Sequence, residues 1–173
     1  MPGLVDPNFS HSIIYICEHS PEGAMGLVVN NPLDVPLSQI FEQFEIDYST
    51  KIGSQALLSG GPVQTDRGFV LHRPAEREWE STLVISSDIS LTASKDIIPD
   101  IAQERGPNDV IIALGYSGWG PGQLEEELVS NAWLTIPGDA NIVFNVPFER
   151  RAGAAAAKIG IDLNQLSTIT GHA

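Results

Sequence analysis

Cysteine is almost absent from this chain of 173 residues, in which Cys17 is the only one. A single cysteine excludes an internal disulfide and any C-x-x-C pair for zinc or redox chemistry. The fold must therefore rest on a hydrophobic core, which a chain of this length can form as one domain. We expect a single domain over residues 1–173, and the lone cysteine fits the reducing cytoplasm.

Long apolar runs are absent as well. No segment approaches the roughly 20 apolar residues that a membrane-spanning helix needs. The first residues, MPGLVDPNFSHS, also lack the basic segment followed by an apolar one that marks a signal peptide. We therefore expect no membrane insertion.

Basic residues are scarce, with 9 Lys and Arg against 22 Asp and Glu, and the formal net charge is −13. A chain of this charge repels nucleic-acid phosphates at long range, and no stripe of basic residues offsets that repulsion. Arg150 and Arg151 are the only adjacent pair of basic residues. The composition argues against direct binding to DNA or RNA and leaves a protein or a small molecule as the expected partner.

What the chain does contain is a series of short apolar segments separated by glycine and proline. Period-two and β-branched patterns predict strands, and spacings of three and four residues predict helices. The order of these elements lacks a steady β-α-β rhythm, so we predict a mixed α+β fold. The predicted strands are 12–19, 24–30, 55–63, 67–72, 81–91, 110–115, 133–136 and 141–146. The predicted helices are 37–44, 95–103, 124–132 and 148–160, the last one stopped by Gly160.

The stretch GYSGWGPGQLEEEL, residues 115–128, follows a predicted strand and leads into a predicted helix. A nucleophile elbow would need G-x-S-x-G, but Trp119 stands where the second glycine belongs. A phosphate cradle is disfavoured because Glu125, Glu126 and Glu127 would repel an anion at the start of the helix. We interpret the stretch as a tight glycine turn in which Ser117 bonds locally, and keep Ser117 as a weaker nucleophile candidate.

Cys17 and His19 are two residues apart on a predicted strand, so we expect both side chains on one face. Such a pair could activate a thiolate or begin a metal site. A zinc site needs two more ligands, and neither His11 nor His72 has a supporting spacing. The sequence favours Cys17 as a buried structural residue, and we expect no metal and no cofactor.

The segment GGPVQTDRGFVLH contains a second group of polar residues. Asp66, Arg67 and Gly68 form a typical tight-turn tripeptide, with Gly68 in the left-handed position. The alternative is an acid/base pair formed by Asp66 and His72. The turn is the favoured interpretation.

The blocks MPGLVDPNF, YICEH with EGAMGLVVN, GGPV with DRGFVLH, ALGYSGWGPGQLEEEL and NAWL occur in this order. With these blocks the chain resembles the AlgH/YqgE family of bacterial proteins, from Met1 to the final GHA. The resemblance implies an α+β domain whose bent, mixed sheet closes into a pseudo-barrel with helices packed outside. The family carries a transcriptional-regulator label, but it brings no catalytic residues to assign here.

Two departures from the family pattern carry expectations of their own. Relatives usually have about ten residues before the position of Met1, including an apolar segment that would form a strand. Two alternatives follow: either this sequence starts late, or this N-terminal strand is absent and one sheet edge is exposed. Relatives also commonly carry lysine at the position of Asn31, so an anion site that depends on that lysine is not expected.

Three functions remain open on this sequence. The favoured one is a non-enzymatic regulatory or binding protein whose contact surface lies around Asp66, Arg67 and Gly68 and around 117–120, that is, Ser117, Gly118, Trp119 and Gly120. The second is a hydrolase or thiol-dependent enzyme that uses Cys17 or Ser117 with His19 or His72. The third is a transcriptional regulator that binds DNA.

Overall fold

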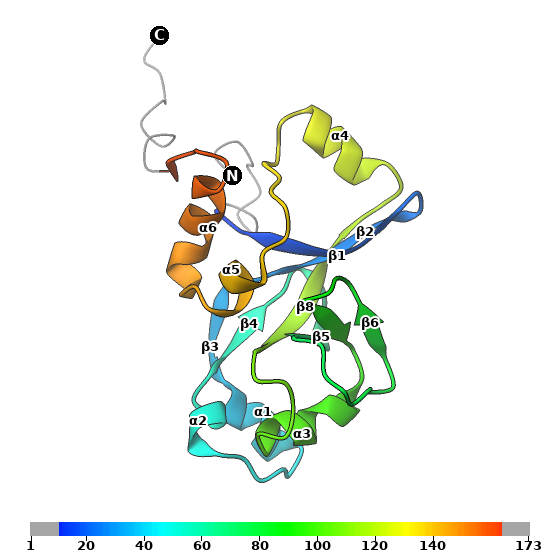
Figure 1. Ribbon diagram of the computed structural model, residues 1–173. Coiled ribbons are helices and arrows are strands. Elements are labelled where there is room, and N and C mark those ends of the chain that lie inside the picture. The colour runs from blue at the N-terminus through cyan, green and yellow to red at the C-terminus, as the bar shows by residue number, and fades with distance from the viewer. Residues whose placement is uncertain (1–10, 164–173) are drawn as a thin grey trace.

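The structure, a computed structural model, describes residues 11–163 (Figure 1). The expectation about the start of the chain falls on residues 1–10 and lies outside this range. The strands are β1 Ile14–Ser20, β2 Gly23–Val28, β3 Pro32–Pro36, β4 Ala56–Ser59, β5 Val63–His72, β6 Thr82–Val84, β7 Ser90–Thr92 and β8 Val110–Trp119. The helices are α1 Leu37–Gln43, α2 Thr50–Gly53, the 3₁₀ turn η1 Lys95–Ile97, α3 Ile98–Ala102, α4 Gln123–Val129, α5 Ala140–Phe144 and α6 Phe148–Ala157.

One curled, mixed sheet forms the centre of the molecule, which confirms the predicted α+β class. Its strand order is β1-β2-β8-β5-β7-β6, with β3 and β4 branching off through β4 and β8. The pair β4–β8 is parallel and the other pairs are antiparallel. Figure 1 shows α1 to α3 gathered at one end of the sheet, α5 and α6 beside its first strands, and α4 standing out at the opposite end.

The central strand β8 changes its neighbour at Gly115. Before this residue Ala113 and Leu114 pair with β4, and after it Ser117 to Trp119 pair with β2. Gly115 has φ 72°, a left-handed conformation that side chains disfavour. A Cβ here would also lie 2.4 Å from the carbonyl oxygen of Gly61. The strand therefore bends at a position that only glycine fits.

Side chains alternate between two cores along the central strands, because successive residues of a strand face opposite sides. On β8, Ile111 and Ala113 pack in one cluster with Leu27 and Val143, while Ile112 packs in the other. This second cluster is covered by α1 and α3. A strand buried on both faces has a continuous apolar run, which is why 110–114 was recognisable in the sequence.

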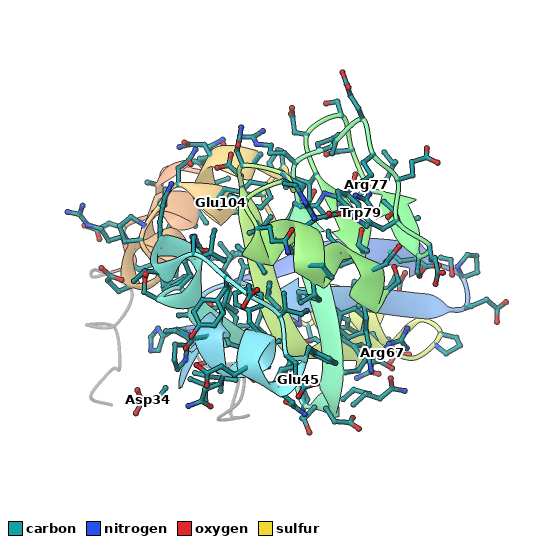
Figure 2. The ribbon with its side chains drawn as sticks, turned by 90° about the horizontal axis from the view of Figure 1, so that it is seen from below. Asp34, Glu45, Arg67, Arg77, Trp79 and Glu104 are labelled. Atoms are coloured by element: carbon teal, nitrogen blue, oxygen red, sulfur yellow. The ribbon has the colours of Figure 1, made fainter. Side chains whose placement is uncertain are left out.

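A buried carboxylate fastens the second cluster to the loop before β6. Asp100 on α3 is 2% exposed and accepts hydrogen bonds from Trp79 Nε1 at 2.9 Å and from Arg77 at 3.0 Å. Figure 2 shows Arg77 and Trp79 next to one another at this end of the molecule. Because both partners hold it in place, we read this carboxylate as structural.

Two turns predicted from glycine are wrong. Residues 115–119 continue strand β8, and the chain turns only at Gly120 to Gly122. Likewise Asp66, Arg67 and Gly68 lie within β5, and the residue with positive φ is Gln64, at 45°. In both places the sheet pairing overrides the local turn preference, because Gly68 pairs with Leu114 of β8 and Ser117 to Trp119 pair with β2.

Three predicted strands also differ. The stretch 81–91 forms a hairpin of two short strands, β6 and β7, and 133–136 has no regular structure. The third, 141–146, begins as helix α5, because the Asp139 side chain accepts hydrogen bonds from the backbone of Asn141 and Ile142. This N-cap fixes a helix where the apolar pattern alone suggested a strand.

Other predictions are confirmed. The predicted strands 12–19 and 24–30 are β1 and β2, which pair as a hairpin whose turn ends at Gly23, with φ 138°. The helix after Pro36 is α1, and Pro99 lies where η1 passes into α3. The alanine-rich segment forms α6, and the chain reverses at Gly160, with φ 74°.

Replacing Gly115 by alanine should lower the free energy of unfolding by about 3 kcal/mol, since it adds a steric clash to an unfavourable φ. Gly122 provides the matched control, because it has φ 73° and an added Cβ would meet no atom within 4 Å. Gly122→Ala should cost only about 1 kcal/mol. Urea denaturation of both variants measures the difference, and equal losses would contradict a close crossing at Gly115.

Candidate functional site

Cys17 and His19 do not lie on the same face, contrary to the sequence prediction. The β1–β2 register shifts between Ile16 and Glu18, so Cys17 is the extra residue of a β-bulge. Cys17 faces the same core as Tyr15, at 6% exposure, and the bulge reverses the alternation after it, which leaves the His19 side chain 47% exposed. His19 instead donates to Glu125 on α4 at 2.5 Å.

The environment of Cys17 is that of a structural residue. Burial raises the pKa of its thiol to about 12, against a smaller lowering by a backbone hydrogen bond from Leu27. A thiol with this pKa carries almost no thiolate at neutral pH. Its Sγ is 3.5 Å from the carbonyl oxygen of Tyr15, and no described histidine is bonded to it.

His72 is buried at 1% exposure, with both ring nitrogens occupied. Nδ1 lies 2.7 Å from the Arg73 carbonyl oxygen, which can only accept, so Nδ1 is the protonated nitrogen. Nε2 therefore accepts from the Thr92 hydroxyl at 2.8 Å. Burial lowers the pKa of His72, so the ring is neutral and bridges β5 and β7. Asp66 is six positions away along β5, roughly 20 Å at strand spacing.

Ser117 is fully buried in β8, and its hydroxyl donates to the Gly60 carbonyl oxygen at 3.3 Å. The predicted local bond of a turn serine is thus replaced by one that spans 57 residues of sequence. The hydroxyl joins β8 to the chain after β4. The four catalytic candidates therefore form no nucleophile–base pair within residues 11–163.

Part of the predicted contact surface does come together. Arg67, Gly118 and Trp119 line one shallow depression with Glu18, Glu22 and Tyr116. The Arg67 guanidinium lies over the Phe69 ring, 5.1 Å from its centre. Asp66, Gly68, Ser117 and Gly120 do not line this depression. Its role in binding stays a prediction.

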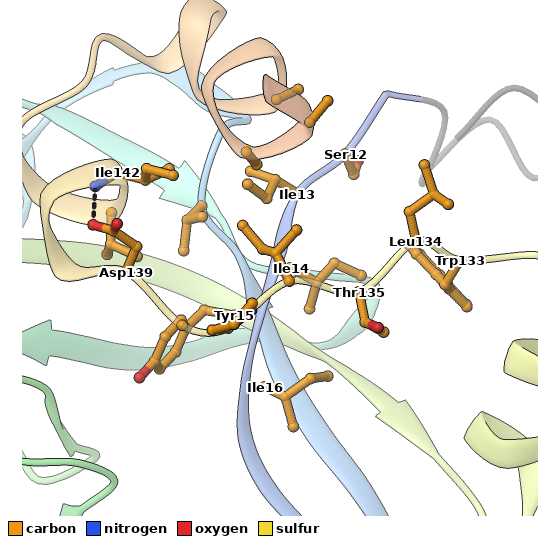
Figure 3. A pocket seen from close by; sticks show the side chains of 18 of the residues that line it. Ser12, Ile13, Ile14, Tyr15, Ile16, Trp133, Leu134, Thr135, Asp139 and Ile142 are labelled. Carbon is orange, nitrogen blue, oxygen red and sulfur yellow. Dashed lines mark hydrogen bonds between the residues drawn. The ribbon is translucent and has the colours of Figure 1, made fainter. Parts of the chain in front are cut away.

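A more enclosed cavity lies beside β1, in a place that the sequence did not single out. This half-open groove has a volume of about 380 Å³ and is lined by residues of β1, segment 133–139, α4, α5 and α6 (Figure 3). We call it the β1 groove. Its lining is mainly apolar and includes Ile14, Tyr15, Trp119, Leu128, Ile142 and Ala155. A cavity of this size and character is typical of a ligand site.

One wall of the β1 groove is the outer edge of β1. Val29 donates to the Ile13 carbonyl at 3.0 Å, which makes residues 13 and 15 the ones whose backbone faces β2. The N–H and C=O groups of Ile14 and Ile16 therefore point away from β2, into the groove. Within residues 11–163, β1 pairs with β2 alone.

A second wall is α4, which a single carboxylate holds in place. Glu127 accepts hydrogen bonds from Trp133 Nε1 at 2.6 Å, Trp119 Nε1 at 2.9 Å and Gln123 at 3.0 Å. Burial raises the pKa of Glu127, but the bonds from Trp133, Trp119 and Gln123 together lower it further, and the net pKa lies below its ordinary value. The two indole rings meet edge to face, 6.1 Å apart.

The third wall consists of α5 and α6, and Arg151 anchors it. This guanidinium is 4% exposed, donates to the backbone carbonyls of Val29 and Val146, and lies 4.5 Å from the Phe148 ring centre. Burial lowers the pKa of Arg151 to about 10, so it stays charged at neutral pH. In the sequence, Arg151 was noted only as one of two adjacent basic residues. In the fold it is buried and its guanidinium binds two backbone carbonyls.

No group of three His, Cys, Asp or Glu side chains in the described range could hold a metal ion. Nor does that range contain a helix with the length and apolar character needed to cross a membrane. The sequence missed the β1 groove because its lining comes from distant segments. Its one local signal, the apolar run at 133–136, was interpreted as a strand.

Residues 1–164 match the family described as AlgH-like, DUF179. The chain belongs to the AlgH-like family. Similar members include UPF0301 proteins of Saccharophagus degradans, 53% identical over all of this chain and 85% of that protein, and of Thioalkalivibrio sulfidiphilus, 51% identical over all of this chain and 92% of that protein.

Solved structures agree with this membership. The solution structure of the AlgH protein from Pseudomonas aeruginosa is 44% identical, with a TM-score of 0.80 over all of this chain and 92% of that one. A crystal structure of protein DIP2367 from Corynebacterium diphtheriae, 18% identical, has a TM-score of 0.69 over 91% of this chain and 82% of that one. The second likeness concerns the fold alone.

The thiol of Cys17 should react slowly in the native protein. We expect Ellman's reagent at pH 8 to label the folded chain at least about a hundredfold more slowly than the urea-unfolded chain, because each pKa unit removes tenfold of the thiolate. Stopped-flow absorbance measures both rates. Comparable rates would show an accessible, reactive thiol and revive the enzyme hypothesis.

Replacing Glu127 by glutamine should loosen α4 and change the fluorescence of Trp119 and Trp133. The lowered native pKa means that Glu127 stabilises the fold fully above its unfolded value, near pH 4.5, and loses this effect as pH falls through the native pKa. The difference in stability between wild type and Glu127→Gln should therefore become smaller at acidic pH. Glu126→Gln, at an exposed position on the same helix, is the control and should leave fluorescence unchanged.

Proposed function

We propose that this protein is a non-enzymatic regulatory or binding protein that holds an apolar partner in the β1 groove. The observation that carries the proposal is the combination of size and lining. The groove of about 380 Å³ is apolar on several walls, and two tryptophans contribute to it. Tryptophan is enriched where proteins bind partners, because it offers a large contact area with one polar atom.

The enzyme alternative has less support. Catalysis by a thiol or hydroxyl needs a base within hydrogen-bond reach of the nucleophile. Cys17 and Ser117 are both buried, and each is bonded to a backbone carbonyl. His72 has both nitrogens engaged and His19 bonds a carboxylate on α4, so neither imidazole serves either nucleophile.

Charge favours a protein or small molecule over nucleic acid. The net charge of −13 leaves DNA binding without its main source of affinity. Transcriptional regulation through direct DNA contact is therefore less well supported than binding of a protein or small molecule. The lone cysteine suits the cytoplasm, where we propose that the protein acts.

The proposal can be tested with Nile red, a neutral dye that fluoresces in apolar sites. Wild-type protein should bind it saturably, while Ala152→Trp, which fills the groove from α6, should weaken binding about tenfold or more. Ala157→Trp is the matched control, because Ala157 lies on the same helix and outside the groove lining. Equal binding by all three proteins, or none by any, would refute a ligand site here.

A further inference from the structure

We propose that the partner of the β1 groove is an extended peptide segment that adds to β1 as a strand, apolar on both faces and flanked by basic residues. This inference rests on the proposed function and deepens it, because it names the class of partner. Three features carry it: the edge of β1, the two faces of the groove and the charge where α4 meets the end of β1.

The edge of β1 offers hydrogen bonds that only a backbone can use in full. Ile14 and Ile16 present their N–H and C=O groups away from β2, at the spacing of an antiparallel or parallel strand. On β2 the equivalent outward N–H, that of Val28, is already taken by the Gly60 carbonyl at 2.8 Å. A strand beside β1 would satisfy the groups at this edge in the same way, as in other cases of strand addition.

The β1 groove is apolar on both faces of the sheet edge. Ile14 packs toward Trp119 and Leu124, whereas Tyr15 packs into the core cluster that contains Val143. Residues of both groups line the same groove. A ligand lying on one face would use half of this lining. An inserted strand sends alternate side chains to each face and uses all of it.

Segment 133–139 crosses the outer edge of β1 and lines the β1 groove along its whole length. Trp133 packs with the Ile14 side, and a Cβ on Gly138 would lie 3.2 Å from the Tyr15 ring on the other side. Figure 3 shows this segment passing across β1, with Trp133 and Asp139 at its two ends. Residues 133–139 and 12–16 line the β1 groove together, so a chain bound in it would lie between the crossing segment and β1.

Charge complementarity defines the flanks of the peptide. The bond between His19 and Glu125 brings α4 next to the end of β1. Exposed carboxylates of Glu18 and Glu126 lie there, in a protein of net charge −13. Lysine or arginine beside the apolar core of the peptide would be attracted to this end, and acidic flanks would be repelled.

The experiment uses the full chain and a fluorescein-labelled probe with five alternating valine and isoleucine residues between two lysine pairs. Fluorescence anisotropy should show that the peptide binds saturably and that Nile red competes with it for the groove. N-methylation of the central amides, which removes backbone donors and keeps the side chains, should weaken binding about tenfold or more. A peptide with glutamate in place of lysine should also bind more weakly.

A protein variant tests the same edge. Ile16→Pro removes an outward N–H without touching the β1–β2 bonds, and edge strands tolerate proline in this orientation. It should weaken peptide binding severalfold, and by more than it weakens Nile red binding, while Ile16→Val keeps the N–H and should bind the peptide as wild type does. Thermal melts establish that both variants are folded.

The outcomes separate this inference from the proposed function. Nile red binding that depends on Ala152, without any peptide binding, overturns the strand partner and leaves the groove as a small-molecule site. If neither Nile red nor the peptide binds, both the strand partner and the proposed function are overturned. Equal binding of the N-methylated and parent peptides overturns strand addition, and light scattering that shows a dimer which the peptide does not dissociate identifies a second copy as the occupant instead.

Discussion

A close crossing of two backbones at Gly60, Gly61 and Gly115 shapes the whole sheet. A Cβ on Gly60 would lie 2.3 Å from the Gly115 carbonyl oxygen, and one on Gly61 would lie 2.3 Å from that of Tyr116. Side chains cannot occupy such gaps, so the two segments approach only as glycines. Because of this crossing, one edge of β8 pairs with β4 before Gly115 and with β2 after it. The change of neighbour separates the β1–β2 hairpin from the rest of the sheet.

The position of that hairpin explains the β1 groove. β2 fastens to β8 through only three register pairs, and β1 follows as the last strand on that side of the described sheet. Its outer edge is covered by α4, α5, α6 and the crossing segment 133–139 instead of by another strand. Helices and irregular segments close an edge sterically without matching its regular hydrogen-bond spacing. A groove with apolar walls and a polar backbone floor is the result.

Helix α4 is the least firmly attached of these covers. It has seven residues, its buried contacts come from the small cluster around Trp119 and Leu124, and Val129 is 85% exposed. Positive φ at Gly122 and Asn131 marks both of its ends. Few buried contacts give a segment low local stability, so α4 is the wall that a partner can displace at the least cost.

The sequence predicted what depends on local patterns and missed what depends on pairing. The strand at 110–114, the helix from Leu37 and the stop at Gly160 follow from apolar spacing and backbone preference. Gly68 and Gly118 looked like turn residues because the sequence does not reveal that Gly68 pairs with β8 and that Gly118 pairs with β2. The helix at 140–144 was missed because the apolar pattern of 141–146 predicted a strand and the Asp139 cap was not recognised. The groove itself joins residues more than a hundred positions apart, which no local pattern encodes.

The bulge at Cys17 links the failed prediction of a thiol–imidazole pair to the proposed binding mode. By inserting one residue, it breaks the regular register after Ile16 and turns His19 away from the Cys17 face, toward α4. A bulge interrupts the regular spacing of backbone groups along an edge strand, which is one way proteins limit edge pairing. The pairing edge of β1 is therefore confined to a short stretch around Ile14 and Ile16. A strand that binds there gains few backbone bonds, so its affinity and selectivity must come mainly from apolar side chains on both faces and from charge at the acidic end.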